Sequence, residues 1–156
     1  MWRPEDVERL NEIYVQPEYL EHMPPASAAA HIADYQRLWA KDGFSKWAAC
    51  ERGTGYLVGR IGLLRHDDWP LAREPVEVGW VLDRAYWGRG LATEGGRAAV
   101  DAWRTYLADE TLYSFTVPEN ARSRAVMVRL DMTFGGTALW HGREHAWYSL
   151  ARQAGS

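Results

Sequence analysis

The chain has 156 residues, a length typical of one domain, and its hydrophobic content of 47% is enough for a sizeable core. A net charge of −3 at pH 7 argues against a nucleic-acid-binding protein, because such proteins usually carry an excess of clustered Lys and Arg. The sequence contains no apolar run long enough to span a membrane and does not open with a signal peptide, so we expect a cytoplasmic protein without a membrane partner.

The N-terminal quarter of the chain predicts two helices separated by a proline-bearing loop. Pro4 and the two acids after it suit the first turn of the first helix. Ser27 is a favourable N-cap for the second helix, which Gly43 is expected to end. These helices are expected over residues 4–14 and 28–41.

A β-hairpin is expected next. Two strand patterns, residues 47–51 and 56–64, flank a turn that contains Gly53 and Gly55. Gly59 and Gly62 lie within the second pattern, where a glycine marks a bulge or a close approach of two backbones.

Residues 76–82 alternate with period two and predict a further strand. The turn after it carries Gly88 and Gly90, and a helical pattern covers residues 93–106. Glycines let a ligand approach the backbone closely, and the first N–H groups of a helix are free to bind an anion such as a phosphate. The two glycines alone are equally consistent with a tight turn. Neither a Walker loop nor a dinucleotide fingerprint is present, since no GK[ST] follows and Thr93 stands where a third glycine is required.

The C-terminal part predicts a strand over residues 112–117 and a helix over 121–130. An antiparallel pair of strands, residues 131–140 and 144–150, is expected to follow, with a frayed tail over residues 153–156. Alternating helices and strands with antiparallel ends predict an α/β fold with a mixed sheet, in a single domain over residues 1–156.

The string EVGWVLDRAYWGRGLATEG, which begins at Glu77, resembles the acyl-CoA-binding motif of the GNAT acetyltransferases. The similarity is greatest to the branch that acetylates protein N-termini, the ribosomal-protein (Rim-type) enzymes. The family pattern Q/R-x-x-G-x-G/A falls on residues 87–92, where Trp87 replaces the usual Gln or Arg; an aromatic residue is normal in this branch.

A second string, VPENARS from Val117 to Ser123, resembles the N-x-x-S element of the same family. Two departures accompany it. Asp131 replaces a usual glycine, and Trp2-Arg3-Pro4 matches only the end of the family's first strand. The resemblance covers nearly the whole chain, and its two motifs have the expected order and spacing.

The resemblance implies the GNAT acyl-CoA N-acyltransferase fold, a mixed, mostly antiparallel sheet flanked by about four helices. The first two helices and the loop between them are expected to form one wall of the acceptor site. The implied activity moves an acetyl group from acetyl-CoA to a primary amine, with a protein or peptide N-terminus as the favoured acceptor. Two alternatives stay open: a small antibiotic or metabolite amine as acceptor, and a non-catalytic acyl-CoA-binding module. A monomer or homodimer without a metal cofactor is expected.

The same resemblance implies the acyl-CoA contacts. The strand edge should pair with the pantetheine amides and polarise the thioester carbonyl, and the glycine turn should hold the pyrophosphate. The implied contacts are Trp80, Val81, Leu82, Trp87, Gly88, Arg89, Gly90, Leu91, Ala92, Thr93, Asn120 and Ser123.

Two side chains are candidates for the chemistry. Glu77 matches the strand glutamate that some GNAT enzymes use as a base, and partial burial would raise its pKa toward neutrality. The alternative is a structural pair with an arginine. Ser123 is the candidate that stabilises the thiolate, because Met127 stands where many members have a tyrosine. The alternative for Ser123 is a hydroxyl that hydrogen-bonds the backbone. The alternative for Asn120 is a helix N-cap.

Other chemically capable residues have simpler interpretations. Cys50 is the only cysteine, which excludes an intrachain disulfide, and it is expected in the core. The run His66-Asp67-Asp68 could ligate a metal or contact the acceptor, although a solvated loop is the favoured interpretation. The spacing of His141 and His145 does not suggest zinc, and Glu144 is a second candidate base on weak grounds.

Overall fold

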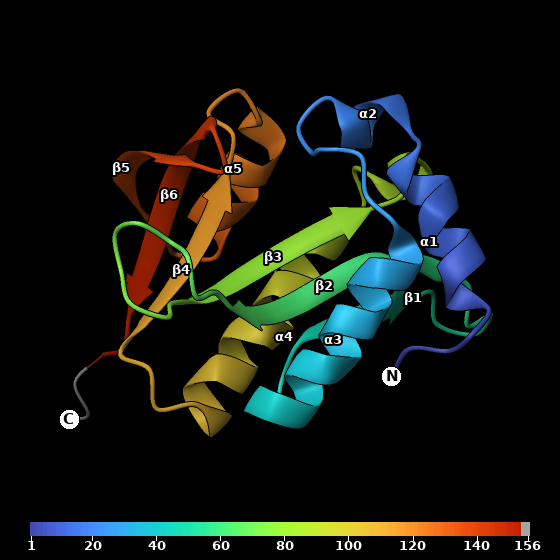
Figure 1. Ribbon diagram of the computed structural model, residues 1–156, viewed down its shortest axis with the longest axis horizontal. Coiled ribbons are helices and arrows are strands. Elements are labelled where there is room, and N and C mark those ends of the chain that lie inside the picture. Colours follow the sequence, from blue (N-terminus) through green and yellow to red (C-terminus); the bar gives the residue numbers. More distant parts are fainter. Residues whose placement is uncertain (154–156) are drawn as a thin grey trace.

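Six strands form one mixed sheet in the computed structural model, which describes residues 1–153 (Figure 1). Within those residues the strand order is β1-β2-β3-β4-β6-β5, and β3 with β4 is the one parallel pair. The predicted α/β class and mixed sheet are confirmed. The strands are β1 (Lys46–Cys50), β2 (Leu57–Arg65), β3 (Val76–Leu82), β4 (Thr111–Thr116), β5 (Thr133–Trp140) and β6 (Arg143–Ala151).

The helices cover both faces of the sheet. In Figure 1, α1 and α3 lie over one face of β1–β3 while α4 lies over the opposite face. None of the helices between residues 1 and 153 combines the length and the apolarity that crossing a bilayer requires. The helices are α1 (Asp6–Tyr14), α2 (Pro17–Leu20), α3 (Ala28–Asp42), α4 (Leu91–Tyr106) and α5 (Ala121–Arg129), with one 3₁₀ turn, η1 (Arg84–Tyr86).

The helix ends follow the local chemistry that the sequence indicated. The Ser27 hydroxyl accepts the Ala30 N–H at 3.3 Å, and Gly43 ends α3 in the left-handed region at φ 80°. Helix α4 begins two residues earlier than expected, at Leu91, because Gly90 adopts φ 73° and serves as its N-cap. Of the predicted frayed tail, residues 154–156 lie outside the described part of the chain.

The face of the sheet beneath α1–α3 carries an unusual set of residues. Register places Gly62 opposite Gly79 and Arg60 opposite Val81, on the same face as Lys46 and Glu77. A side chain at Gly79 would meet Lys46 Nζ at 2.6 Å, so the glycine pair leaves the room that the lysine occupies. Gly59 and Gly62 mark close backbone approaches, as one of the two interpretations predicted: a Cβ at Gly59 would lie 2.0 Å from the Val81 carbonyl oxygen.

Strands β3 and β4 pair over two positions and then diverge. Their register joins Val76 to Leu112 and Glu77 to Tyr113, and Figure 1 shows the strands spreading apart beyond that point. Ser114 Oγ donates to the Val78 carbonyl oxygen at 2.8 Å where the strands part. Beyond Val78, β3 therefore presents a backbone edge that β4 does not cover.

The edge of the sheet at β1 differs from expectation at the N-terminus and at Cys50. Residues 1–3 form no strand; instead the Trp2 indole N–H donates to the Lys46 carbonyl oxygen at 3.0 Å on edge strand β1. The prediction that Cys50 is a core residue was wrong, because Cys50 is the last residue of this edge strand and is exposed.

We predict that Trp103→Ala lowers the free energy of unfolding by about 3–5 kcal/mol, because Trp103 is fully buried between α4 and the sheet. Tyr106→Ala is the matched control on the same helix: Tyr106 is 82% exposed, and its loss should cost less than about 0.5 kcal/mol. Urea denaturation of both variants measures the difference. Similar losses in the two variants would contradict this account of the core.

Candidate active site

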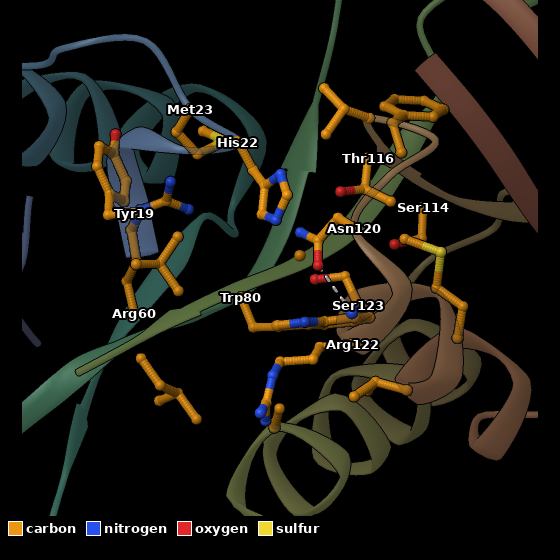
Figure 2. A pocket seen from close by; sticks show the side chains of 18 of the residues that line it. Tyr19, His22, Met23, Arg60, Trp80, Ser114, Thr116, Asn120, Arg122 and Ser123 are labelled. Carbon is orange, nitrogen blue, oxygen red and sulfur yellow. Dashed lines mark hydrogen bonds between the residues drawn. The ribbon is translucent and has the colours of Figure 1, made fainter. Parts of the chain in front are cut away.

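A cavity of about 1110 Å³ runs from the N-terminus of α4, past the opening between β3 and β4, to the space beneath α2 and α3. Figure 2 shows Asn120, Ser123 and Trp80 on one side of it and Tyr19 with Arg60 on the other. The cavity brings together the two predicted motifs and Glu77. One predicted contact is missing from its lining: the Arg89 guanidinium lies over the Tyr86 ring, 4.8 Å from its centroid.

The glycine turn at one end of the cavity is open to a ligand. Gly88 and Gly90 adopt φ values of 76° and 73°, and a Cβ at either would meet no atom within 4 Å. The turn is anchored from behind, since Asp83 accepts hydrogen bonds from Arg9, Gln16 and the Ala85 N–H. A fixed turn with open space in front of its backbone is suited to a close-fitting anion.

Helix α4 starts at this turn without a side-chain cap. The first backbone N–H groups of the helix have no intrahelical partner, and the helix dipole adds a favourable potential for negative charge. Arg122 and Arg84 lie over the Trp87 ring, at 4.7 and 5.0 Å from its centroid. Of these, Arg122 lines the cavity, so it adds a positive charge that the motif alone did not identify.

The start of α5 forms the neighbouring wall. Asn120 Oδ1 accepts the Ser123 N–H at 3.2 Å, so the N-cap interpretation of Asn120 is confirmed (Figure 2). The Ser123 hydroxyl lines the cavity and makes no hydrogen bond to another described residue, in contrast to the backbone-bonded alternative. Met127 is buried and cannot donate a proton.

Glu77 occupies the centre of a charged group on β1, β3 and the loop after β2. Its carboxylate lies 2.8 Å from His66 Nε2 and 3.7 Å from Lys46 Nζ. Burial alone would raise the pKa of Glu77, but the Lys46 charge and the His66 hydrogen bond outweigh burial and lower the pKa to about 2. The expectation of a raised pKa was therefore wrong, and the partner is a lysine instead of an arginine. Burial lowers the pKa of Lys46 to about 8, against the pull of Glu77, so the two groups form an ion pair at neutral pH.

His66 is the functional candidate that the sequence offered only as an alternative, and for which a role as a proton acceptor was not expected. The side chain turns inward and is 14% exposed, contrary to the solvated loop that was favoured. Its ring packs edge-on against Trp140, with centroids 5.1 Å apart, and at a tilt against Phe115, with centroids 5.7 Å apart. Because a histidine can gain and lose a proton near neutral pH, its placement on the cavity wall beside an ionised carboxylate is suited to proton transfer.

The remaining polar candidates make no ion pair with this group, although His141 and His145 line the same cavity. Asp68 pairs with His141 at the surface, Glu144 is exposed and outside the cavity lining, and His145 bonds the Arg143 carbonyl oxygen at 2.9 Å. Among residues 1–153, no three His, Cys, Asp or Glu side chains are grouped as metal ligands.

Comparisons with known proteins agree with this geometry. The profile of the family described as "Acetyltransferase (GNAT) domain" matches residues 1–133. The uncharacterized protein YkkB of Bacillus subtilis (strain 168) is 27% identical over 96 residues, which are 61% of this chain and 54% of YkkB. The match thus spans about half the length of that relative.

Three solved structures are similar in fold. An acetyltransferase from Agrobacterium tumefaciens str. C58 has a TM-score of 0.83 at 24% identity, covering 97% of this chain and 88% of that one. The ribosomal-protein-S5-alanine acetyltransferase of Vibrio fischeri has a TM-score of 0.77 at 14% identity, covering 98% and 91%. The aminoglycoside acetyltransferase AAC(6')-Ib, in complex with coenzyme A and kanamycin, has a TM-score of 0.80 at 17% identity, covering 98% and 93%.

We predict that the stability contributed by Glu77 is present above about pH 4.5 and is lost as the pH falls toward 2, because the folded-state pKa lies below the ordinary value of 4.5. The difference in free energy of unfolding between the native chain and Glu77→Gln should shrink by about 3 kcal/mol over this interval. Urea denaturation at several pH values measures it. The exposed Glu144→Gln is the control and should show no such trend. A pH-independent difference for Glu77→Gln would contradict the ion-pair assignment.

Proposed function

The chain belongs to the acetyltransferase (GNAT) domain family, and from this membership we propose that it transfers an acetyl group from acetyl-CoA directly to a primary amine. The observation that carries the proposal is the opening between β3 and β4, which meets an uncapped, glycine-bearing helix start and a buried histidine–carboxylate pair in one cavity. An anion site, a free strand edge and a proton acceptor are what acetyl transfer from a coenzyme A thioester to an amine requires.

On the donor side, we propose that the amides at the start of α4 bind the pyrophosphate while Arg122 adds charge. The open space before Gly88 and Gly90 fits a group that approaches the backbone closely. The edge of β3 at residues 80–82 would bond the pantetheine amides and polarise the thioester carbonyl, although the Leu82 carbonyl oxygen already accepts the Trp87 indole N–H at 3.1 Å. Holding both reactants in this way makes their encounter effectively unimolecular, an advantage of several kcal/mol.

The acceptor ammonium must lose a proton before its nitrogen can attack the thioester carbon. Glu77 is a poor direct base at neutral pH because its pKa is about 2. We propose instead that His66 takes the proton, directly or through a water. With Nε2–H donated to the ionised Glu77, neutral His66 carries its acceptor lone pair on Nδ1. Glu77 then fixes the ring and stabilises the imidazolium that forms.

The carbon–sulfur bond breaks as the new carbon–nitrogen bond forms, and the coenzyme A sulfur leaves as a thiolate. Ser123 is the proposed group that donates a hydrogen bond to this sulfur, since its hydroxyl lines the cavity and has no other described partner. Asn120 holds the backbone of Ser123 in place and can offer its amide N–H₂ to the cofactor arm.

A protein or peptide N-terminus is the first candidate acceptor, as the resemblance to the Rim-type branch implies. An α-amine has a pKa of about 7.7–8.0 against about 10.4 for lysine, so it needs less help to lose its proton. A small amine is the second candidate.

Arg143 of β6 donates to the Glu21 and His22 carbonyl oxygens, at 3.4 Å each, and so links the loop after α2 to β6 across the acceptor end of the cavity.

Release of coenzyme A thiol from acetyl-CoA, measured against a panel of peptides and small amines, tests the proposal. Turnover with an amine supports it, and the best acceptor separates the two classes. Tight acetyl-CoA binding without turnover on any amine would instead support a non-catalytic acyl-CoA-binding module.

We predict that Gly90→Glu weakens acetyl-CoA binding by at least about 100-fold, because it places bulk and negative charge where the pyrophosphate binds. Gly53→Glu is the control: Gly53 also has a positive φ, 86°, and open space around it, but lies in the β1–β2 turn. Both substitutions carry a similar backbone cost of about 1–2 kcal/mol. Isothermal titration calorimetry measures the affinity, and retained binding in Gly90→Glu would show that the pyrophosphate site is misplaced.

We predict that His66→Gln lowers kcat about 100-fold and alters the pH profile of kcat/KM, because the glutamine can still donate to Glu77 but cannot accept a proton. The Kd for acetyl-CoA should stay within about 3-fold of the native value. Glu144→Gln, at an exposed position outside the cavity lining, should leave both unchanged. A native pH profile in His66→Gln would remove His66 from proton transfer.

A further inference from the structure

Arg60 is a buried cation without a counterion. It lies on β2, is 6% exposed, and forms no ion pair with any carboxylate of residues 1–153. Its one hydrogen bond within the described chain runs from Nε to the Tyr14 hydroxyl, at 2.9 Å. A charge removed from water is strongly destabilising unless it is paired, so an arginine in this state calls for an explanation.

Aromatic rings account for part of its environment. The guanidinium carbon lies 5.9 Å from the centroids of both Tyr14 and Tyr35. Cation–π contacts favour the charge, but a ring carries no net charge and accepts no strong hydrogen bond from the guanidinium. No hydrogen bond within the described residues occupies the two terminal nitrogens of Arg60, so their N–H groups are available to a ligand.

Three of the carboxylates that line the same cavity are engaged elsewhere, and another, Glu119, is exposed and forms no ion pair within residues 1–153. Glu77 bonds His66 and pairs with Lys46, Glu18 lies 3.4 Å from Arg84, and Asp34 lies 3.2 Å from Arg37. Glu21 is 70% exposed and lies 3.9 Å from His22. None of these groups comes within ion-pair distance of Arg60 in the described structure, and Lys46 adds a second positive charge nearby.

Two further polar atoms beside Arg60 are buried without a partner. These are the Tyr19 hydroxyl and His22 Nδ1. In Figure 2 the Arg60 guanidinium lies alongside the Tyr19 side chain, with His22 projecting into the same space. Burial raises the pKa of Tyr19 to about 12 against the opposing charge of Arg60, so its hydroxyl remains a donor at neutral pH. All three residues line the cavity at its acceptor end.

We propose that Arg60 and Tyr19 bind a carboxylate carried by the acceptor, so that the acceptor is a small amino acid with its amine and carboxylate on one molecule. The inference rests on the proposed acetyl transfer and selects the second acceptor class, a small amine, over a protein or peptide N-terminus. The terminal nitrogens of a guanidinium match the two oxygens of a planar carboxylate, and the single negative charge balances the single buried positive charge. A phosphate dianion would leave a net negative charge in the same buried space.

The link from Arg143 to the loop after α2 bounds the same cavity, because Arg143, Glu21 and His22 line it together with Arg60. A long peptide would have to pass that link. In the proposed complex the carboxylate lies at Arg60, and the amine, a few bonds away, points toward the opening between β3 and β4.

The first test compares each of a set of amino acids, including β-alanine and γ-aminobutyrate, with its own carboxamide as acceptor for acetyl-CoA. After correction for the fraction of free amine, kcat/KM should be at least about 30-fold higher for the best carboxylate than for its carboxamide. Arg60→Met should abolish that preference, and Arg60→Lys should keep part of it. Arg37→Met, which removes an exposed arginine of α3, should leave the preference intact. Equal rates on carboxylates and carboxamides in the native protein would overturn the inference and leave the acetyltransferase proposal standing.

The second test does not depend on turnover. Thermal shifts of the protein with coenzyme A are measured with N-acetyl-amino acids and with their carboxamides as probes. Tm should rise with the carboxylates alone, and the rise should be absent in Arg60→Met. If Arg60→Met does not fold, Tyr19→Phe serves in its place, because it removes only the hydroxyl and should reduce carboxylate affinity several-fold. If the protein bound neither acetyl-CoA nor coenzyme A, the proposed function itself would be contradicted. Equal Tm shifts with the carboxylates and the carboxamides would contradict only the carboxylate site.

Discussion

The separation of β3 from β4 is the constraint on which the rest of the site depends. The two strands share two paired positions, and the Ser114 hydroxyl takes the next carbonyl group of β3, at Val78. Beyond it, the Leu82 carbonyl oxygen accepts the Trp87 indole N–H at 3.1 Å. The other backbone groups of β3 that face the opening need partners from outside the sheet, since buried backbone groups that stay unpaired are costly. The starts of α4 and α5 meet at the same opening, so a ligand that enters it meets both helix termini and the strand edge together.

The positions of the charged side chains on the acceptor side depend on which residues of the sheet are glycines. Lys46, Arg60 and Glu77 all lie on the face beneath α1–α3, where the facing glycines Gly62 and Gly79 leave room for long side chains. Glu77 balances Lys46, which leaves the face with one uncompensated positive charge, at Arg60. Buried charges are expensive, so this imbalance is easier to understand as part of a binding site than as part of a core.

The sequence was sufficient to predict features that depend on short-range interactions, such as strand bounds, helix caps and turns. The bounds of β3, the cap at Ser27 and the open glycine turn were predicted from neighbours within a few residues, and the cap at Asn120 was among the alternatives. It was insufficient where distant residues meet. The pKa of Glu77 is set by Lys46 and His66, from another strand and a loop, and Arg60 bonds a tyrosine 46 positions away. No periodic pattern reports such contacts, so the inward turn of His66 and the burial of Arg60 became evident in three dimensions.

The most direct test of this account is a crystal structure of the protein with coenzyme A. We predict that the pyrophosphate lies on the backbone amides at Gly88, Gly90 and the first turn of α4, and that the pantetheine arm enters between β3 and β4 along residues 80–82. The thiol should then point toward the part of the cavity that His66 and Ser123 line. Coenzyme A bound elsewhere, or an opening that stays closed when coenzyme A is bound, would contradict the central claim.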